Sequence, residues 1–124
     1  RVLDTRSGAR VLGGSVTRVS TGLAGTEAAL VNLTAVNATS FGYVTADKCS
    51  RLTAEPHNFS NLNFIPTFAV ANLAAVGLDP DGSFCIYTSA DVHLIVDVQG
   101  GFDDGATMRL TLVAPQRVAD SRAD

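Results

Sequence analysis

Strict alternation of apolar and polar residues is the feature that most constrains the fold of this chain. Segments 29–36 and 92–98 both show it: in the first, Val31 and Leu33 would share one face, while Asn32 lies on the other. A period of two residues is typical of a β-strand that buries one face, because successive side chains of a strand point to opposite sides. The sequence therefore predicts a protein built from half-buried β-strands.

Other segments show the same character, and none has the helical periodicity of about 3.6 residues with capping residues at its ends. Residues 68–78 are ambiguous, since their alanine content would also suit a helix. Glycine, proline and aspartate separate the candidate strands, as at Gly13–Gly14 and Gly100–Gly101, where we expect turns. About nine strands are expected, at residues 1–4, 16–20, 29–36, 41–46, 59–64, 68–76, 84–89, 92–98 and 108–113.

An internal repeat indicates how these strands are grouped. The motif Asn32–Val36 recurs as Asn72–Val76, and each copy is followed by a turn and another strand. Two related β-hairpins are the simplest interpretation. Because the length of 124 residues is typical of one domain, we predict an all-β fold. The expected architecture is an antiparallel β-sandwich of about nine strands built from two related hairpins, with a β-trefoil or a barrel as the alternative.

A second repeat joins the two ends of the chain. Arg1–Arg6, with the sequence Arg-Val-Leu-Asp-Thr-Arg, returns as Arg117–Arg122, with the sequence Arg-Val-Ala-Asp-Ser-Arg. We therefore expect residues 1–116 to form a single domain and residues 117–124 to be the start of a following repeat unit or a C-terminal tail. A strand without a domain of its own can pair with a neighbouring molecule, so self-association through this end is a further expectation.

Several segments together carry a resemblance to a known family: Arg1–Arg6 and residues 31–36, 42–45, 60–64, 70–72 and 92–102. They resemble a tandem all-β repeat domain of secreted and cell-surface proteins of actinobacteria, which often lies beside peptidase or cell-wall amidase modules. The resemblance covers nearly the whole chain and departs from the family pattern at Gly101, where that pattern has an aromatic residue. It implies secretion and an accessory role, but it implies no particular ligand and therefore no binding residue.

Composition limits the partners of the chain. Hydrophobic residues make up 46% and charged residues 17%, which is the opposite of the composition of a disordered chain. The net charge of −3 provides no basic footprint for nucleic acid or for an anionic membrane surface, and the apolar runs are too short to span a bilayer. We therefore expect no nucleic-acid partner and no membrane insertion.

The chain has two cysteines, Cys49 and Cys85, and each lies beside one copy of the internal repeat. Such a pair in an all-β extracytoplasmic domain favours a disulfide that ties the two halves together, and with it a secreted or cell-surface location. Two separately buried thiols are the alternative. The two distant histidines, His57 and His93, do not complete the spacing of a metal site, so neither a metal nor another cofactor is expected.

Asp97 interrupts an otherwise apolar strand, and a partly buried carboxylate needs a partner. The opening motif supplies the cations Arg1 and Arg6, whose side chains can bind a carboxylate with specific, bidentate geometry. We expect Asp4, Arg6 and Asp97 to form a structural polar network that fixes the first strand. A polar ligand pocket at the same place is the alternative.

Tyr43 and Tyr87 are the best candidates for a ligand surface. They occupy equivalent places in the two copies of the repeat, in a chain that has two Tyr, six Phe and no Trp. Carbohydrate-binding modules present aromatic faces to sugar rings, although packing in the core explains the same residues equally well.

Signals for catalysis or metal binding are weak. His57 and His93 are the only histidines, and Ser60 can be combined with either on paper, but no Gly-x-Ser-x-Gly elbow is present. Residues 79–83, Asp-Pro-Asp-Gly-Ser, are similar to an oxygen-rich calcium loop but lack its later ligands, which favours a tight turn. A calcium ion there or at residues 103–105 is the minor alternative. The chain is therefore predicted not to be an enzyme.

Taken together, the sequence predicts a non-catalytic extracellular or cell-surface module of a larger secreted protein. It would act as a spacer, an adhesion unit or a cell-wall-associated binding unit, with cell-wall polysaccharide or neighbouring repeat domains as its partners. The alternative is a carbohydrate-binding module attached to a hydrolase. A free-standing hydrolase is the third and weakest hypothesis.

Overall fold

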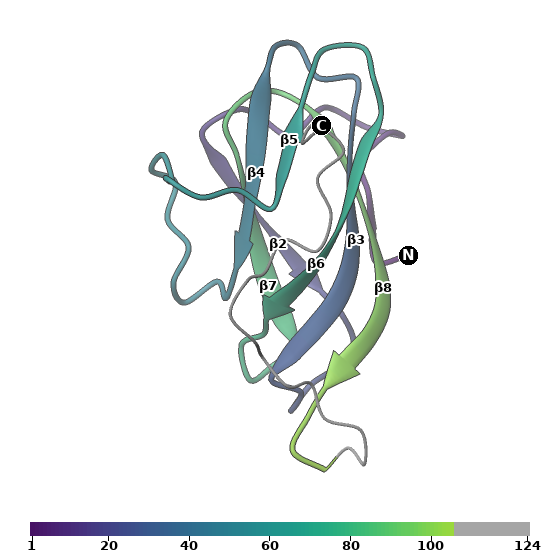
Figure 1. The fold of residues 1–124 in the computed structure, drawn as a ribbon, viewed down its shortest axis with the longest axis vertical. Coiled ribbons are helices and arrows are strands. Elements are labelled where there is room, and N and C mark those ends of the chain that lie inside the picture. The colour runs from purple at the N-terminus through teal and green to yellow at the C-terminus, as the bar shows by residue number, and fades with distance from the viewer. Residues whose placement is uncertain (106–124) are drawn as a thin grey trace, which may run out of the picture.

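The fold is all-β throughout the part of the chain that the structure describes. The computed structural model describes residues 1–105, in which eight antiparallel strands form two four-stranded sheets (Figure 1). Each strand lies where the sequence predicted one, whereas the strand expected at 108–113 and the second repeat at 117–122 lie outside the described residues. The strands are β1 (Leu3–Asp4), β2 (Ser15–Ser20), β3 (Ala28–Val36), β4 (Gly42–Asp47), β5 (Leu62–Phe64), β6 (Val70–Gly77), β7 (Ser83–Thr88) and β8 (His93–Phe102).

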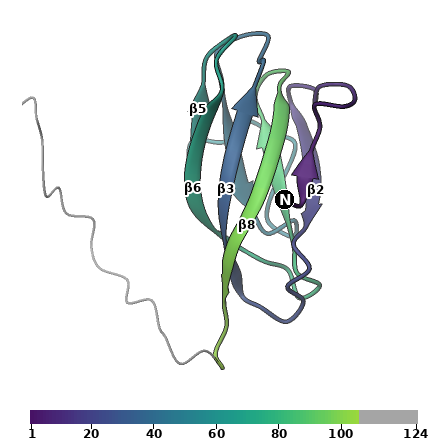
Figure 2. The ribbon, with the colours of Figure 1, turned by 90° about the vertical axis from the view of Figure 1, so that its right-hand side faces the viewer.

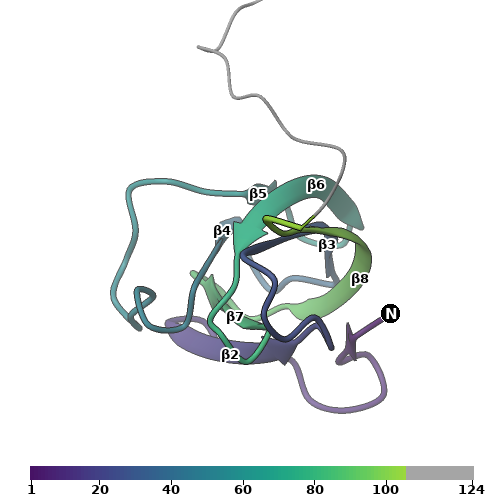
Figure 3. The same ribbon diagram turned by 90° about the horizontal axis from the view of Figure 1, so that it is seen from below.

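The two sheets face each other as the layers of a sandwich. One has the strand order β1-β8-β3-β6 and the other β2-β7-β4-β5; Figure 3 shows β8, β3 and β6 on one side of the molecule and β2, β7 and β4 on the other. β1 therefore pairs with β8, β2 with β7, β3 with β6 and β4 with β5, as in an antiparallel ribbon that is rolled up. This order is that of a jelly roll, a two-sheet arrangement of eight strands.

The repeated motif lies in two neighbouring strands, but its two copies are not hairpins. β3 and β6 pair with each other, so that Asn32 lies opposite Leu73 and Leu33 opposite Asn72. Each copy then crosses to the other sheet, because β3 is followed by β4 and β6 by β7, and these two strands pair there. The prediction of two hairpins is therefore wrong: a repeat shows that two segments are similar, but not that each strand pairs with the strand that follows it.

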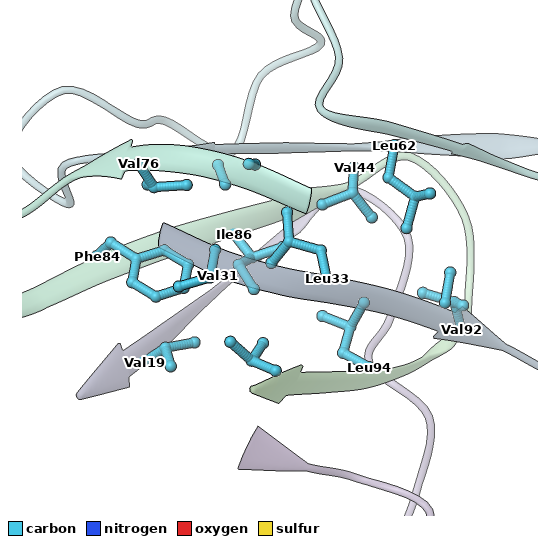
Figure 4. Close-up of a cluster of buried hydrophobic side chains, with 14 of the residues drawn as sticks. Val19, Val31, Leu33, Val44, Leu62, Val76, Phe84, Ile86, Val92 and Leu94 are labelled. Atoms are coloured by element: carbon cyan, nitrogen blue, oxygen red, sulfur yellow. The ribbon is translucent and has the colours of Figure 1, made fainter. Parts of the chain in front are cut away.

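The core lies between the two sheets and is built from the inward-facing half of each alternating strand. In β3 every second residue is buried, and Val31 and Leu33 are at most 2% exposed. Figure 4 shows these side chains packed between the sheets with Phe84 and Ile86 of β7. Burial of one such side chain stabilises a fold by about 1.5–3 kcal/mol relative to exposure, so this cluster is the main source of stability.

Two segments that the sequence left as a turn or as ambiguous are strands in the structure. Gly100–Gly101 lies inside β8, where the register with β3 shifts between Leu30 and Val31. Gln99 is the extra residue between the pairs Leu30–Gly100 and Val31–Val98, so the strand continues through both glycines beyond a bulge. The ambiguous stretch 68–78 contains strand β6, which Figure 2 shows in one sheet with β3 and β8.

Candidate functional site

β7 is buried at all six positions, because both of its faces are covered. Its inner face packs into the core, and its outer face lies beneath residues 48–61, which connect β4 to β5 and which we call the covering loop. Figure 1 shows this loop extending outward beside β4. Cys85 and Tyr87 on the outer face of β7 form a second buried cluster with Leu52 of the covering loop.

A disulfide attaches the beginning of the covering loop to β7. Cys49 is bonded to Cys85, with Cα atoms 4.7 Å apart and a sequence separation of 36. The last register pair between β4 and β7 is Asp47 opposite Cys85. The disulfide therefore connects the two segments just beyond the end of the β4–β7 pairing. The predicted disulfide is confirmed, and it joins the strand that follows one repeat copy to the segment that follows the other.

Hydrogen bonds attach the end of the covering loop. The backbone N–H of Ala46 donates to the side-chain oxygen of Asn61 at 2.7 Å. The backbone N–H of His57 donates to the phenol oxygen of Tyr43 at 3.0 Å. The loop is therefore fixed covalently at its start and by side-chain hydrogen bonds near its end, with little support from a strand ladder.

Tyr43 and Tyr87 are brought together, but only Tyr43 is placed to meet a ligand. Their ring centroids are 5.9 Å apart, and the ring of His57 packs edge-on against Tyr87 at 5.0 Å. Tyr87 is 3% exposed, and this burial is the main reason why the pKa of its phenol is raised. The predicted pair of surface tyrosines is therefore corrected: Tyr87 supports the site from beneath, because the covering loop lies over the face that alternation alone would leave in solvent.

A hollow of about 200 Å³ lies at this aromatic cluster. Phe59, which is 52% exposed, is its most open aromatic side chain. Phe59 was not predicted, and the only sequence signal for it is an aromatic residue within the polar stretch 55–60. We call this feature the aromatic hollow; its lining among the described residues is Tyr43, His57, Asn58, Phe59, Ser60 and Asn63. These residues supply aromatic, amide and hydroxyl groups, and none of them is a carboxylate, lysine or arginine.

Ser60 and the two histidines do not form a catalytic arrangement in residues 1–105. The hydroxyl of Ser60 donates to the side-chain oxygen of Asn63 at 3.1 Å, not to His57. His93 lies in the other sheet, where its Nδ1 is 3.3 Å from the hydroxyl of Thr5. The structure therefore assigns these side chains to hydrogen bonds within the fold.

The polar side chains of the opening motif meet Asp97 at the edge of the first sheet. Arg1 donates to Asp97 at 3.1 Å and to Asp4 at 3.0 Å, and Arg6 donates to Asp4 at 2.7 Å. Arg1 is thus the link between Asp97 and the Asp4–Arg6 pair. The hydrogen bonds from Arg6 lower the pKa of Asp4, and those from Arg1 lower the pKa of Asp97. Because these side chains are 26–50% exposed, solvent screens the pairs, and their main effect is on the position of β1.

The calcium-like segment 79–83 forms a tight turn between β6 and β7. The carboxylate of Asp79 accepts a hydrogen bond from Ser50 of the covering loop, and that of Asp81 accepts one from Ser83. These hydrogen bonds are the main reason why the pKa values of both carboxyl groups are lowered. In the described part of the chain, no group of three or more side chains is placed to hold a metal ion.

No protein-family model, no curated protein and no solved structure matches this chain. Residues 1–105 contain no helix that is long and apolar enough to cross a membrane. The functional assignment therefore depends on the geometry of the covering loop and the aromatic hollow.

Proposed function

We propose that this chain is a non-catalytic module of a larger secreted or cell-surface protein, where it acts as a spacer, an adhesion unit or a cell-wall-associated binding unit. The observation that carries the proposal is the Cys49–Cys85 disulfide, which holds the covering loop on a two-sheet scaffold. Structural disulfides persist in oxidising, extracytoplasmic compartments and are rare in the cytosol.

The resemblance to the tandem repeat domain of actinobacterial surface proteins supports the same assignment. The return of the Arg1–Arg6 motif at Arg117–Arg122 supports residues 1–116 as one unit and residues 117–124 as the start of a following unit or a C-terminal tail. Neighbouring repeat domains and cell-wall polysaccharide are the partners that such a module would meet.

Fractionation of the cells that make the full-length protein tests this proposal. Culture medium, envelope and cytosol are collected in the presence of a thiol-alkylating reagent, and the domain is detected with an antibody. We expect it in the medium or the envelope, with Cys49 and Cys85 unreactive until a reductant is added. A cytosolic protein with two alkylated thiols would contradict the proposal.

Carbohydrate binding on behalf of an attached hydrolase is a second candidate function, and the aromatic hollow favours it. The rings of Tyr43 and Phe59 offer apolar faces, and Asn58, Ser60 and Asn63 offer hydrogen-bonding groups beside them. A sugar ring presents the complementary combination of an apolar face and peripheral hydroxyls. The six described lining residues carry no acidic or strongly basic side chain, which suits a neutral polysaccharide.

Co-sedimentation with cell-wall polysaccharides, followed by a glycan array, tests this second function. Phe59→Ala removes the most open ring of the hollow and should weaken binding about tenfold. The matched control is Phe68→Ala, which removes a ring that is 62% exposed outside the hollow and should leave binding unchanged. Saturable binding that is the same for wild type and Phe59→Ala, or no saturable binding at all, would count against carbohydrate recognition.

A further inference from the structure

The short strand β1 covers one edge of β8. Within residues 1–105, β8 is the one strand that pairs with β1, and the N–H groups of Val2 and Thr5 donate to the carbonyls of Val96 (2.9 Å) and Leu94 (3.0 Å). The hydroxyl of Thr5 also accepts the N–H of Leu94 at 2.9 Å. These few hydrogen bonds satisfy a sheet edge that would otherwise expose unpaired backbone groups.

Side chains make this docking specific. Leu3 packs against the main core from the edge, whereas Arg1 reaches Asp97 on the solvent side. Asp4 in turn holds Arg1. The docking strand is therefore defined by a guanidinium, an inward apolar side chain, a carboxylate and a hydroxyl at fixed spacing.

Residues 117–122 repeat this set of groups. Their sequence Arg-Val-Ala-Asp-Ser-Arg contains all three charged residues of Arg1–Arg6 at the same spacing, and a serine hydroxyl replaces that of Thr5. The main difference is a smaller apolar side chain: Ala119 is the counterpart of Leu3, which packs against the core. The tail thus has a counterpart of each charged and hydroxyl side chain of Arg1–Arg6, together with a smaller apolar side chain.

We propose that residues 117–122 are a second docking strand, which binds the β8 edge of another copy of this domain when that edge is free of the copy's own residues 1–6. Addition of a strand to an open sheet edge is a recurrent mode of recognition, and exchange of equivalent elements between copies requires no new kind of contact. The proposal does not depend on what the aromatic hollow binds.

The length of the connecting chain allows a second copy to be the partner. Residues 106–116 can span about 35–40 Å when extended, which is enough to leave one domain and reach a neighbour. In each copy, β1 covers this edge with Leu3, which packs better than Ala119 would. The proposed contact therefore forms on another copy only where the residues 1–6 of that copy have left the edge.

A mixture of two full-chain variants tests the proposal. The acceptor carries Thr5→Pro, which removes the N–H that donates to Leu94 and so loosens its own β1, together with Asp120→Arg, which disables its own tail. The donor carries Ala119→Leu, which restores the apolar side chain found at Leu3. Analytical ultracentrifugation should show a heterodimer, and a fluorescently labelled donor should bind about tenfold more tightly than one with the native tail.

Val118→Leu is the matched control for the donor. It adds apolar bulk one position away, where the β1 counterpart Val2 is 36% exposed, so it should leave the affinity within about twofold. In the acceptor, the additional change Asp97→Ala removes the partner of the tail guanidinium and should weaken the complex. An equal gain in affinity from Val118→Leu and Ala119→Leu would overturn the proposal, because nonspecific hydrophobic association would then explain the complex.

Absence of a heterodimer between the Ala119→Leu donor and a folded acceptor, at the highest soluble concentration, would also overturn the proposal. Circular dichroism and the intact disulfide report whether the acceptor is folded. If Thr5→Pro prevents folding, Leu3→Ser replaces it, because this change loosens the same strand through its side chain and leaves the backbone hydrogen bonds possible.

Discussion

Breaking the Cys49–Cys85 disulfide should destabilise the domain by about 4 kcal/mol. The bridge joins residues separated by 36 positions, and the chain-entropy relation for a loop of that length gives about 3.8 kcal/mol at 25 °C. Reduction leaves both sulfur atoms in place, so little packing is lost and the entropy of the unfolded chain dominates. A loss of this size is a large fraction of the stability of a typical domain, which is about 5–15 kcal/mol.

Urea unfolding of one preparation, with and without a reductant, measures this loss by far-UV circular dichroism. The same sequence is used in both arms, so no substitution complicates the comparison. For a urea dependence of about 1.5 kcal/mol per molar, the midpoint should fall by about 2–3 M on reduction. The double variant Cys49→Ala/Cys85→Ala should lose at least as much, because the Cys85 sulfur is part of the second buried cluster.

A midpoint that moves by less than about 0.5 M would refute this reasoning. It would mean that the disulfide does not restrict the unfolded chain, or that the oxidised fold holds strain that cancels the entropic gain. Thiol titration in denaturant, before the reductant is added, establishes that the first arm is fully oxidised.

Three further predictions concern the core, a close glycine contact and the ion pairs. Leu33→Ala, at a core position 2% exposed, should lower the free energy of unfolding by about 2–5 kcal/mol in the urea assay, and a loss below about 1 kcal/mol would contradict the packing described. Gly42→Ala should cost about 1–3 kcal/mol in the same assay, because a Cβ there would lie 2.6 Å from the buried ring of Phe64; a neutral effect would contradict that contact. Acid should weaken the docking of β1: the pKa values of Asp4 and Asp97 are lowered by folding, so their contribution is complete above the unfolded carboxyl pKa of about 3.9 and is lost as the pH falls through the folded values. Thermal unfolding across this range should show a smaller acid effect in Asp4→Asn, and an identical pH dependence in both proteins would argue against the network.

Strand positions could be predicted from the sequence because they depend on local pattern. The alternation in β3 and the turn residues around each strand are visible within a few positions, and all eight described strands lie where these signals occur. The pairing of strands could not be predicted in the same way. Asn32 lies opposite Leu73 only because β3 and β6 meet in the folded sheet, and neither segment alone indicates that each is followed by a crossing to the other layer.

The candidate site was predictable where residue chemistry left few choices. A chain with two cysteines offers a single intramolecular pairing, and Asp97 required a cation that the opening motif could supply. The burial of Tyr87 was not predictable, since the alternation of β7 says nothing about a loop that lies over its outer face. Phe59 belongs to that same loop, and its place in the hollow follows from hydrogen bonds and a disulfide formed at distant positions.

The two candidate functions use different parts of this molecule. Only carbohydrate binding uses the covering loop that the disulfide holds. A spacer needs only the sandwich, whose main core contains neither Cys49 nor Cys85. A carbohydrate-binding module also needs the covering loop, because residues of that loop form most of the lining of the aromatic hollow, and the loop begins at the disulfide. Under reducing conditions in which the domain stays folded, a spacer would keep its mechanical role, whereas a binding module would lose affinity as the covering loop loosens. Polysaccharide binding that persists unchanged in the reduced, folded protein would contradict this expectation, because the hydrogen bonds at Asn61 and His57 would then be sufficient to hold the loop.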